Sequence, residues 1–377
     1  MQRAHRSGAL FLLMPPIVDS HQDLAWNILS FGRDYLRSVE ETRRLEKGGL
    51  TVDRNGDTLL GWPEYQEGEV AVIFATLFST PARWAYEWET YVYKTFEEAN
   101  KQYRQQMDLY HRLTDDHPDK FRFINSASGL DEVLASQQKA NPAGGGYPVG
   151  LLPLMEGAEC ITRLDELEDW WGLGLRFIGP AWAGTRFCGG TKEPGPLTDE
   201  GRSLLAAMAD HEFTLDLSHM DEPAALESLD IYPGHVVVTH GNCLALMPGH
   251  EFNRHLSDRV IHGILERDGI IGVVPFNTFL KDGWLKGKSS REEVSIERLV
   301  DHIDHICQLA GDARHVGIGT DFDGGFGLQS TPNEIDTIAD LQKLVPLLLA
   351  RGYSQKEAAA VLGGNWIDVL HRSLPAL

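Results

Sequence analysis

The stretch Ile17-Val18-Asp19-Ser20-His21-Gln22-Asp23 begins with two apolar residues and ends with an imidazole and a carboxylate two positions apart. Side chains at positions i and i+2 of an extended strand point to the same face. His21 and Asp23 therefore project together from the end of a buried strand. A nitrogen and an oxygen ligand on rigid backbone suit a borderline divalent ion such as zinc. A hydrogen-bonded pair at a strand end is the alternative that this motif alone leaves open.

The chain has 377 residues, of which 42% are hydrophobic, enough for one barrel-sized domain or two smaller ones. It shows no internal repeat and no linker, so we predict a single domain over residues 1–377. The formal net charge of -21 repels phosphate backbones and anionic lipid. We therefore expect neither nucleic acid nor a membrane as a partner, and no stretch is long and apolar enough to span a bilayer.

Two features bear on the cellular location. The apolar run 9–14 follows basic residues but lacks a small-residue cleavage site and leads straight into the His21 strand, so we interpret it as a lead-in and not as a secretory signal. Four cysteines are scattered without C-x-x-C spacing, which argues against a disulfide framework and against a thiolate zinc site. Free thiols suit a reducing compartment, so we predict a cytoplasmic protein.

Apolar runs typical of strands alternate with helical patterns along the chain, which predicts a parallel sheet. The candidate strands are residues 17–23, 70–78, 121–125, 150–156, 173–178, 213–218, 236–239, 269–274 and 316–320. The run 121–125 is the weakest, and we place it outside the barrel. The remaining eight predict an α/β fold of the (β/α)8, or TIM-barrel, type. We also expect a long loop over 48–68, a helix over 88–113 and a surface position for His302 on a helix over 296–309.

Four further strand ends carry side chains suited to metal binding or proton transfer: Glu156, His219, His240 and Asp321. They follow the third, fifth, sixth and eighth strands of the predicted barrel, and the opening pair follows the first. All would lie on the C-terminal face, where TIM-barrel enzymes keep their active sites. Without a metal, the buried carboxylates would be uncompensated, at a cost of several kcal/mol each. We therefore predict a metal centre.

The number of ligands suggests two ions. One is bound by His21 and Asp23, the other by His219 and His240, and Glu156 bridges them. Three protein ligands per ion leave open positions for a shared water or hydroxide, a nucleophile at neutral pH. Asp321 is left over, and a carboxylate at this place can take the proton of the nucleophile and return it to a leaving amine.

Taken together, these motifs resemble the membrane (renal-type) dipeptidase family of the amidohydrolase superfamily, and the resemblance covers nearly the whole chain. The segments that carry it are Val18-Asp19-Ser20-His21-Gln22-Asp23-Leu24, Met155-Glu156-Gly157, Leu217-Ser218-His219, Val238-Thr239-His240, Gly317-Ile318-Gly319-Thr320-Asp321-Phe322-Asp323-Gly324 and Gly363-Gly364-Asn365-Trp366. It implies a TIM-barrel hydrolase with two Zn2+ ions per chain that cleaves dipeptides, including some with a D-residue on the carboxyl side. It implies the same five ligands and the same proton shuttle, and it suggests a homodimer.

The predicted substrate pocket departs from the family pattern. Arg254 stands where the family has the arginine that binds the substrate carboxylate, within Arg254-His255-Leu256-Ser257-Asp258. Trp182 stands where the family has a histidine that contacts the scissile carbonyl. Phe276 lies in Pro275-Phe276-Asn277, where the family has Asn-Phe-Tyr. Asp323 is expected to orient a neighbouring ligand.

We therefore predict a binuclear zinc dipeptidase that acts on a small dipeptide-like molecule by attack of a metal-bound hydroxide. Two alternatives stay open. The altered pocket favours a related amidohydrolase acting on N-acyl amino acids, cyclic amides or lactones. The last alternative is a metal-binding barrel with little catalysis, against which the intact Asp321 argues, because a structural site has no need of a proton shuttle.

Overall fold

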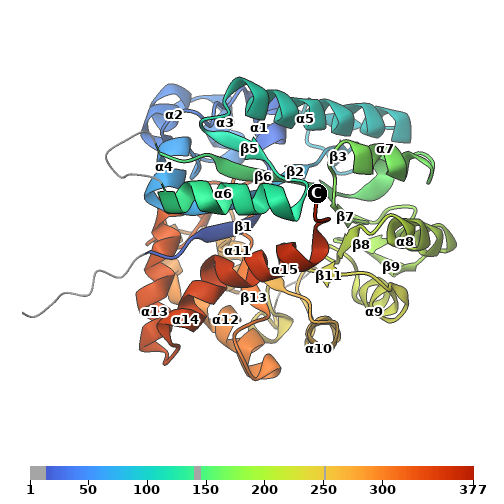
Figure 1. Cartoon of the computed structure of the whole chain (residues 1–377). Helices are drawn as coiled ribbons and strands as arrows, with labels where there is room; N and C mark the ends of the chain where they lie inside the picture. Colours follow the sequence, from blue (N-terminus) through green and yellow to red (C-terminus); the bar gives the residue numbers. More distant parts are fainter. Residues whose placement is uncertain (1–13, 140–145, 250–251) are drawn as a thin grey trace, which may run out of the picture.

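A computed structural model describes residues 14–139, 146–249 and 252–377, and a closed ring of parallel strands lies at its centre (Figure 1). Neighbouring strands follow in the order β11-β10-β7-β6-β2-β1-β13-β12. A parallel bridge between Val238 and Ile271 joins the two ends of this order and closes the barrel. The strands are β1 (Ile17–Gln22), β2 (Val70–Leu77), β6 (Val149–Glu156), β7 (Phe177–Gly179), β10 (Thr214–Asp216), β11 (Val236–Val237), β12 (Ile271–Val273) and β13 (Val316–Ile318). The predicted (β/α)8 barrel is confirmed.

Helices cover the outside of the barrel, and α6 and α15 cross its near side in Figure 1. The helices are α1 (Leu24–Phe31), α2 (Val39–Glu46), α3 (Leu50–Asn55), α4 (Trp62–Glu67), α5 (Phe96–Asp116), α6 (Ala127–Lys139), α7 (Glu166–Gly172), α8 (Asp199–Asp210), α9 (Glu222–Ile231), α10 (Asp258–Glu266), α11 (Asn277–Leu280), α12 (Glu297–Ala310), α13 (Leu344–Ala350), α14 (Gln355–Ala359) and α15 (Asn365–Ser373). Short helical turns are η1 (Ala158–Cys160), η2 (Leu244–Leu246), η3 (Arg291–Glu293), η4 (Leu328–Ser330), η5 (Ile338–Lys343) and η6 (Ala360–Gly364).

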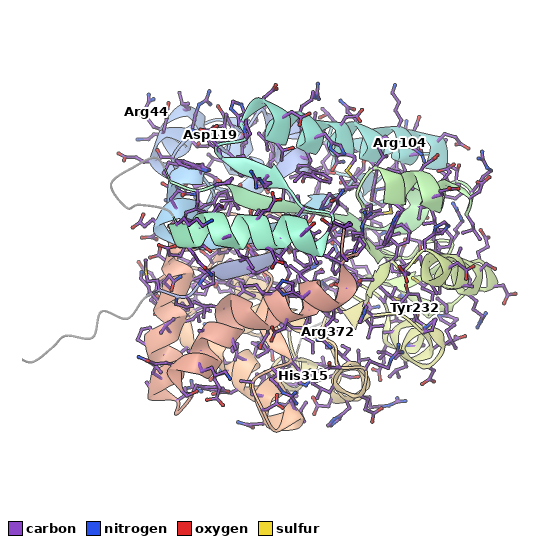
Figure 2. All side chains as sticks on the ribbon, in the orientation of Figure 1. Arg44, Arg104, Asp119, Tyr232, His315 and Arg372 are labelled. Atoms are coloured by element: carbon purple, nitrogen blue, oxygen red, sulfur yellow. The ribbon has the colours of Figure 1, made fainter. Side chains whose placement is uncertain are left out.

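Strands β1, β2 and β6 are buried along their whole length. Because helices cover one face and the barrel interior the other, β2 and β6 have near-continuous apolar runs, which is the pattern that identified them. Outside the barrel, Arg104 of α5 lies on the side of α7 (Figure 2), with its guanidinium carbon 4.8 Å from the ring centre of the buried Trp170. No helix among the described residues is long and apolar enough to cross a bilayer.

The weakest strand candidate forms β5 (Phe121–Phe123), which pairs with β6 but lies off the barrel path, as predicted. Two small sheets stand on the C-terminal side of the barrel strands. One pairs β3 (Thr80–Pro81) with β4 (Val92–Tyr93), and the other pairs β8 (Cys188–Gly190) with β9 (Glu193–Leu197). Both belong to connections that follow barrel strands, and these connections form the rim of the site.

Three local predictions were wrong. The expected loop over 48–68 contains α3 and α4, each of which buries a single residue and therefore shows no apolar stripe. The helix expected from residue 88 begins at Phe96, because the Thr95 side chain caps it by accepting a hydrogen bond from the Glu98 amide. His302 is fully buried, and its Nδ1 accepts a hydrogen bond from the Cys243 amide at 3.1 Å.

The C-terminal segment packs directly against the first strand. A Cβ atom on Gly363 would lie 2.3 Å from the Pro16 carbonyl oxygen and 3.0 Å from the Val18 amide nitrogen. Only glycine permits this approach without displacing β1. The strand that carries His21 is thereby held by β2 and β13 at its edges and by η6 on its outer face.

Candidate metal centre

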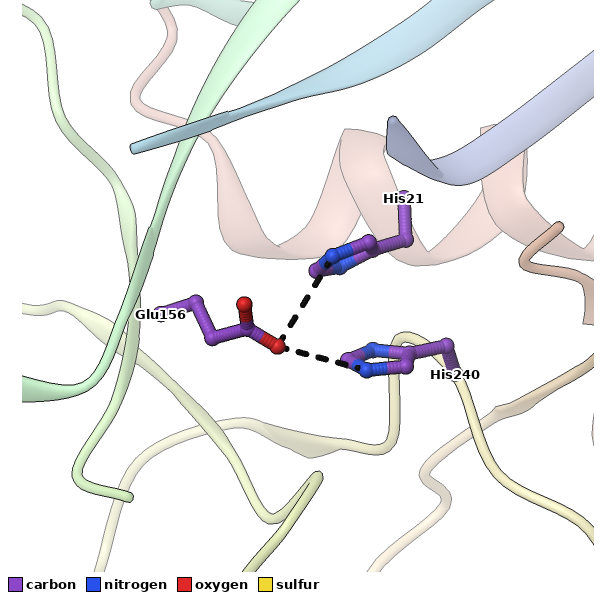
Figure 3. Close-up of side chains that lie close together, drawn as sticks. All are labelled: His21, Glu156 and His240. Carbon is purple, nitrogen blue, oxygen red and sulfur yellow. Dashed lines mark ion pairs between the residues drawn. The ribbon is translucent and has the colours of Figure 1, made fainter. Parts of the chain in front are cut away.

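Glu156, the last residue of β6, stands at the middle of the predicted ligand set. Its Oε1 lies 3.0 Å from His219 Nε2, 3.3 Å from His240 Nε2 and 3.8 Å from His21 Nε2. Figure 3 shows the side chains of His21 and His240 turned toward this oxygen. The Nε2 atoms of His219 and His240 lie 2.8 Å apart. Residues from strands one, three, five and six of the barrel thus meet at one carboxylate, as the strand count predicted.

The other two predicted residues complete the cluster on the side of β1. Asp23 Oδ2 lies 3.7 Å and Asp321 Oδ1 lies 3.8 Å from His21 Nε2. Asp23 follows β1, and Asp321 follows β13, which pairs with β1 through Asp19 and Ile318. This side of the cluster is rich in carboxylates, whereas the side of β10 and β11 carries two imidazoles.

The donor atoms fit a divalent metal. Within the described part of the chain, both ring nitrogens of His21 and Oδ1 of Asp23 have no hydrogen-bond partner, although they are buried. An unpaired buried polar atom costs about 1–3 kcal/mol. The ligand atoms of His21, Glu156 and His240, and those of His21, Asp23 and Asp321, lie within 4.8 Å of one another. Imidazole nitrogens and carboxylate oxygens are ligands that zinc accepts.

Burial and neighbouring charge act in opposite directions on His21. Burial alone would lower its pKa, but the Glu156, Asp23 and Asp321 carboxylates overcome burial and raise it to about 10. In the absence of a metal, the ring therefore holds a proton that partly neutralises three carboxylates. A cation at the same place would take over this role.

Burial has a simpler effect on the other groups. It lowers the pKa of His219 and of His240 well below the usual value, so both imidazoles are neutral and keep a lone pair for a ligand. Burial raises the pKa of Glu156 well above its usual value and that of Asp321 to about 7. The positive charges of His21 and Arg254 lower both pKa values but do not outweigh burial.

Hydroxyl groups hold both histidines of the β10–β11 side, and our sequence analysis did not identify them. Thr191 Oγ1 lies 2.9 Å from His219 Nδ1, and Thr239 Oγ1 lies 3.1 Å from His240 Nδ1. Thr239 Oγ1 also donates to Asp216 Oδ2 at 2.5 Å. Such partners fix the ring orientation of metal-binding histidines. The sequence could have predicted the role of Thr239, because it directly precedes His240. It could not have predicted that of Thr191, which lies 28 positions from His219.

Buried aspartates tie neighbouring strand ends together. Asp19 of β1 accepts hydrogen bonds from the Thr320 amide at 2.7 Å and from Thr320 Oγ1 at 2.6 Å. Asp216 of β10 accepts from the Thr239 amide at 3.0 Å. Each bond fixes the backbone next to a predicted site residue. Both aspartates are part of apolar strands, and this placement is the signal that could have identified them.

The backbone is left-handed at two predicted site residues, with φ 66° at His219 and 57° at Asp321. Non-glycine residues in this region are uncommon and cluster at functional sites. Asp323, with φ 64°, was expected to orient a ligand. Instead its carboxylate binds Arg33 at 2.9 Å and Tyr35 at 2.8 Å, so it anchors the loop after β13 to the segment after α1.

A cavity of about 380 Å3 opens over the cluster, and Arg254, Trp182 and Phe276 all line it together with Glu156 and Asp321. Arg254 is 5% exposed; its Nη2 donates to the His240 carbonyl at 3.0 Å, and its Nε has no hydrogen-bond partner among the described residues. Burial lowers its pKa from the usual value.

The two aromatic residues of the predicted pocket form part of its wall. The Trp182 ring centre lies 5.1 Å from that of Phe78 and 6.3 Å from that of His219. Phe276 stacks on Phe326 at 4.2 Å. The structure thus brings every predicted pocket residue to the same cavity as the ligand set.

Comparison with known proteins agrees with this geometry. The membrane dipeptidase family, peptidase family M19, matches residues 9–373. A Klebsiella pneumoniae protein named the uncharacterized protein in pqqA 5' region is 32% identical over 215 residues, 54% of this chain and 74% of that protein. Dipeptidase verJ of Clonostachys rogersoniana is 24% identical over 371 residues, 97% and 86% of the two chains.

Among solved structures, a metallo peptidase from Rhodobacter sphaeroides, liganded with a phosphinate mimic of the dipeptide L-Ala-D-Ala, is 25% identical to this chain. The two superpose with a TM-score of 0.75 over 96% of this chain and all of the other. The resemblance that the motifs carried is confirmed. The chain belongs to the membrane dipeptidase family, peptidase family M19, and is an enzyme of the metallo-dipeptidase class.

Proposed function

We propose that this chain is a binuclear zinc dipeptidase that hydrolyses the peptide bond of small dipeptides. The observation that carries the proposal is the convergence of three histidines and three carboxylates in one cluster, next to a cavity that Glu156, Asp321 and the buried Arg254 line. His21 and Asp23 would hold one zinc ion, His219 and His240 the other, and Glu156 both. When bound, the ions supply positive charge that polarises the scissile carbonyl and makes water more acidic.

Asp321 is the proposed proton shuttle. Its Oδ1 lies 3.8 Å from His21 Nε2, so it borders the ligand set and lines the cavity as well. The carboxylate accepts a proton from the attacking water and delivers it to the nitrogen of the leaving amine. The hydrogen bond from the Asp321 amide to the His21 carbonyl, at 3.1 Å, holds the loop against β1 during this transfer.

Arg254 is the proposed binding group for the substrate's free carboxylate. Its guanidinium is fixed at one end by the His240 carbonyl, and the residue lines the cavity next to Glu156 and Asp321. A planar guanidinium binds a carboxylate through two parallel hydrogen bonds, which positions the scissile bond as well as binding it. Trp182 and Phe276 complete the wall and exclude water.

A second function stays open because Trp182 presents an indole where the family has an imidazole. An apolar wall at this place favours a substrate without a charged amino group, such as an N-acyl amino acid, a cyclic amide or a lactone. A catalytically weak metal-binding barrel is the remaining alternative.

The test combines metal analysis with a substrate panel. We expect about two zinc ions per chain by elemental analysis and hydrolysis of L-Ala-D-Ala. Preference for N-acetyl-D-alanine or a lactone would select the second function. If the zinc-loaded protein turns over neither the dipeptide, nor the N-acyl amino acid, nor the lactone, both proposed enzyme functions are contradicted. The weak metal-binding barrel is then favoured.

Three broader expectations stay predictions: a single domain, a homodimer and a cytoplasmic location. Cys160, Cys188, Cys243 and Cys307 are buried and free, in keeping with a reducing compartment. Light scattering in solution tests the dimer, and fractionation of the source cells tests the location.

A further inference from the structure

Trp26, Trp88 and Tyr86 line the cavity, and Phe31, which does not line it, contacts both Trp26 and Trp88. Ring centres lie 5.3 Å apart for Trp26 and Phe31, 5.9 Å for Phe31 and Trp88, and 5.9 Å for Trp88 and Tyr86. Tyr86 and Trp88 are nearly parallel, with an interplanar angle of 8°. We call these four residues the aromatic track. Exposure rises along it from 5% at Trp26 to 67% at Tyr86.

The inner end of the aromatic track lies beside one half of the metal centre. Trp26 stands on α1, three residues after Asp23, and both line the cavity. Arg254 instead contacts the backbone of His240, in the other half. Glu156 lies between the halves. A substrate with its carboxylate at Arg254 and its scissile bond over Glu156 therefore extends its amino side toward the aromatic track.

Trp26 offers a specific contact at this end. Its Nε1–H is buried and has no hydrogen-bond partner in the part of the chain that the structure describes. Buried indole N–H groups usually find an acceptor. Trp26, Trp88 and Tyr86 all line the cavity, so their rings can contact a bound molecule. The Arg54 guanidinium carbon lies 5.4 Å from the ring centre of Trp88, and Arg54 lines the cavity as well.

We propose that the aromatic track binds a bulky aromatic side chain on the amino-side residue of the substrate. The inference rests on the proposed function, because Arg254 sets the direction of the substrate. Offset and edge-on contacts with the rings of Trp88 and Trp26 favour a flat aromatic group over a methyl group. The aromatic track therefore determines specificity and takes no part in bond cleavage.

The experiment measures kcat/KM of zinc-loaded full-length protein on L-Trp-D-Ala, L-Ala-D-Ala and L-Ala-D-Trp. We expect L-Trp-D-Ala to exceed L-Ala-D-Ala by about tenfold, and L-Ala-D-Trp to show no such advantage. In Trp88→Ala the tenfold ratio falls to about one. Phe96→Ala, which removes an exposed ring outside the cavity, is the matched control and keeps the ratio.

Equal values for L-Trp-D-Ala and L-Ala-D-Ala in the wild type, or an unchanged ratio in Trp88→Ala, would overturn the proposal. If L-Ala-D-Trp is preferred instead, the aromatic track does not bind the amino-side residue of the substrate. If no dipeptide is hydrolysed, the proposed function fails, and calorimetric binding then decides about the aromatic track. Tighter binding of L-Trp-D-Ala than of L-Ala-D-Ala that is lost in Trp88→Ala supports it, and equal binding contradicts it.

Discussion

The floor and the mouth of the cavity are built in different ways. The floor consists of the predicted ligands and Asp321, which stand at strand ends and are held by buried neighbours; His21 is 0% and Glu156 6% exposed. The mouth stands on connections that follow the strands, and Tyr86 and Phe252 are 67% and 47% exposed. The floor can therefore determine whether a bond is cleaved, and the mouth which molecule is chosen. Changes in the floor should affect all substrates alike, and changes in the mouth should alter ratios between substrates.

Metal removal should have the largest effect, because it removes the charge that offsets three clustered carboxylates. Dialysis against a chelator is expected to lower kcat/KM for every dipeptide by at least about 10³-fold. Added zinc should restore it. Elemental analysis should follow the metal content in parallel. If hydrolysis persists at less than a tenth of the normal metal content, catalysis does not depend on the metal.

Asp321→Asn should come next. The amide keeps the size of the side chain but cannot accept the proton, so kcat should fall by about 10²–10⁴-fold. The same factor is expected for small and aromatic substrates, because the change is in the floor. Zinc content, measured in parallel, should stay near the wild-type value. Full activity with two bound zinc ions would rule out the shuttle.

Arg254→Gln should raise KM for L-Ala-D-Ala by about 10- to 100-fold, because a charge-assisted hydrogen bond to the substrate carboxylate is lost. The C-terminal amide of the same dipeptide provides the control. It lacks the carboxylate, so the variant and the wild type should treat it alike. Equal losses on the acid and the amide would show that Arg254 acts on the metal centre and not on the substrate.

Thr191→Val should have the smallest effect of the four. It removes the 2.9 Å contact with His219 Nδ1 and keeps the shape of the side chain. Affinity for one of the two proposed zinc ions is expected to fall about tenfold, as measured by competition with a chromogenic chelator. Thr90→Val, at an exposed threonine, is the matched control. An unchanged zinc affinity would show that the Thr191 hydroxyl does not support His219 as a metal ligand.

The strand pattern predicted the floor because parallel strands of a barrel deliver their C-terminal ends to one face. The place of Glu156 and of His240 at the end of a strand therefore determined where each side chain lies in the barrel. The mouth had no such rule. Thr191 reaches His219 through the β8–β9 hairpin, and Trp88 reaches Phe31 through a segment expected to be helical. Loop paths depend on tertiary packing, which periodicity does not describe. The predicted roles of Arg254, Trp182 and Phe276 stay predictions.

The pairing of β1 with β13 has a consequence for synthesis. His21 and Asp23 leave the ribosome early, but Asp321 and the strand that seats it follow about three hundred residues later. Gly363, which lets η6 close over β1, comes later still. Since domains generally fold as units during synthesis, a nascent chain carries the first two predicted ligands without the rest of the predicted centre. Zinc should therefore be acquired after translation, in one step with barrel closure.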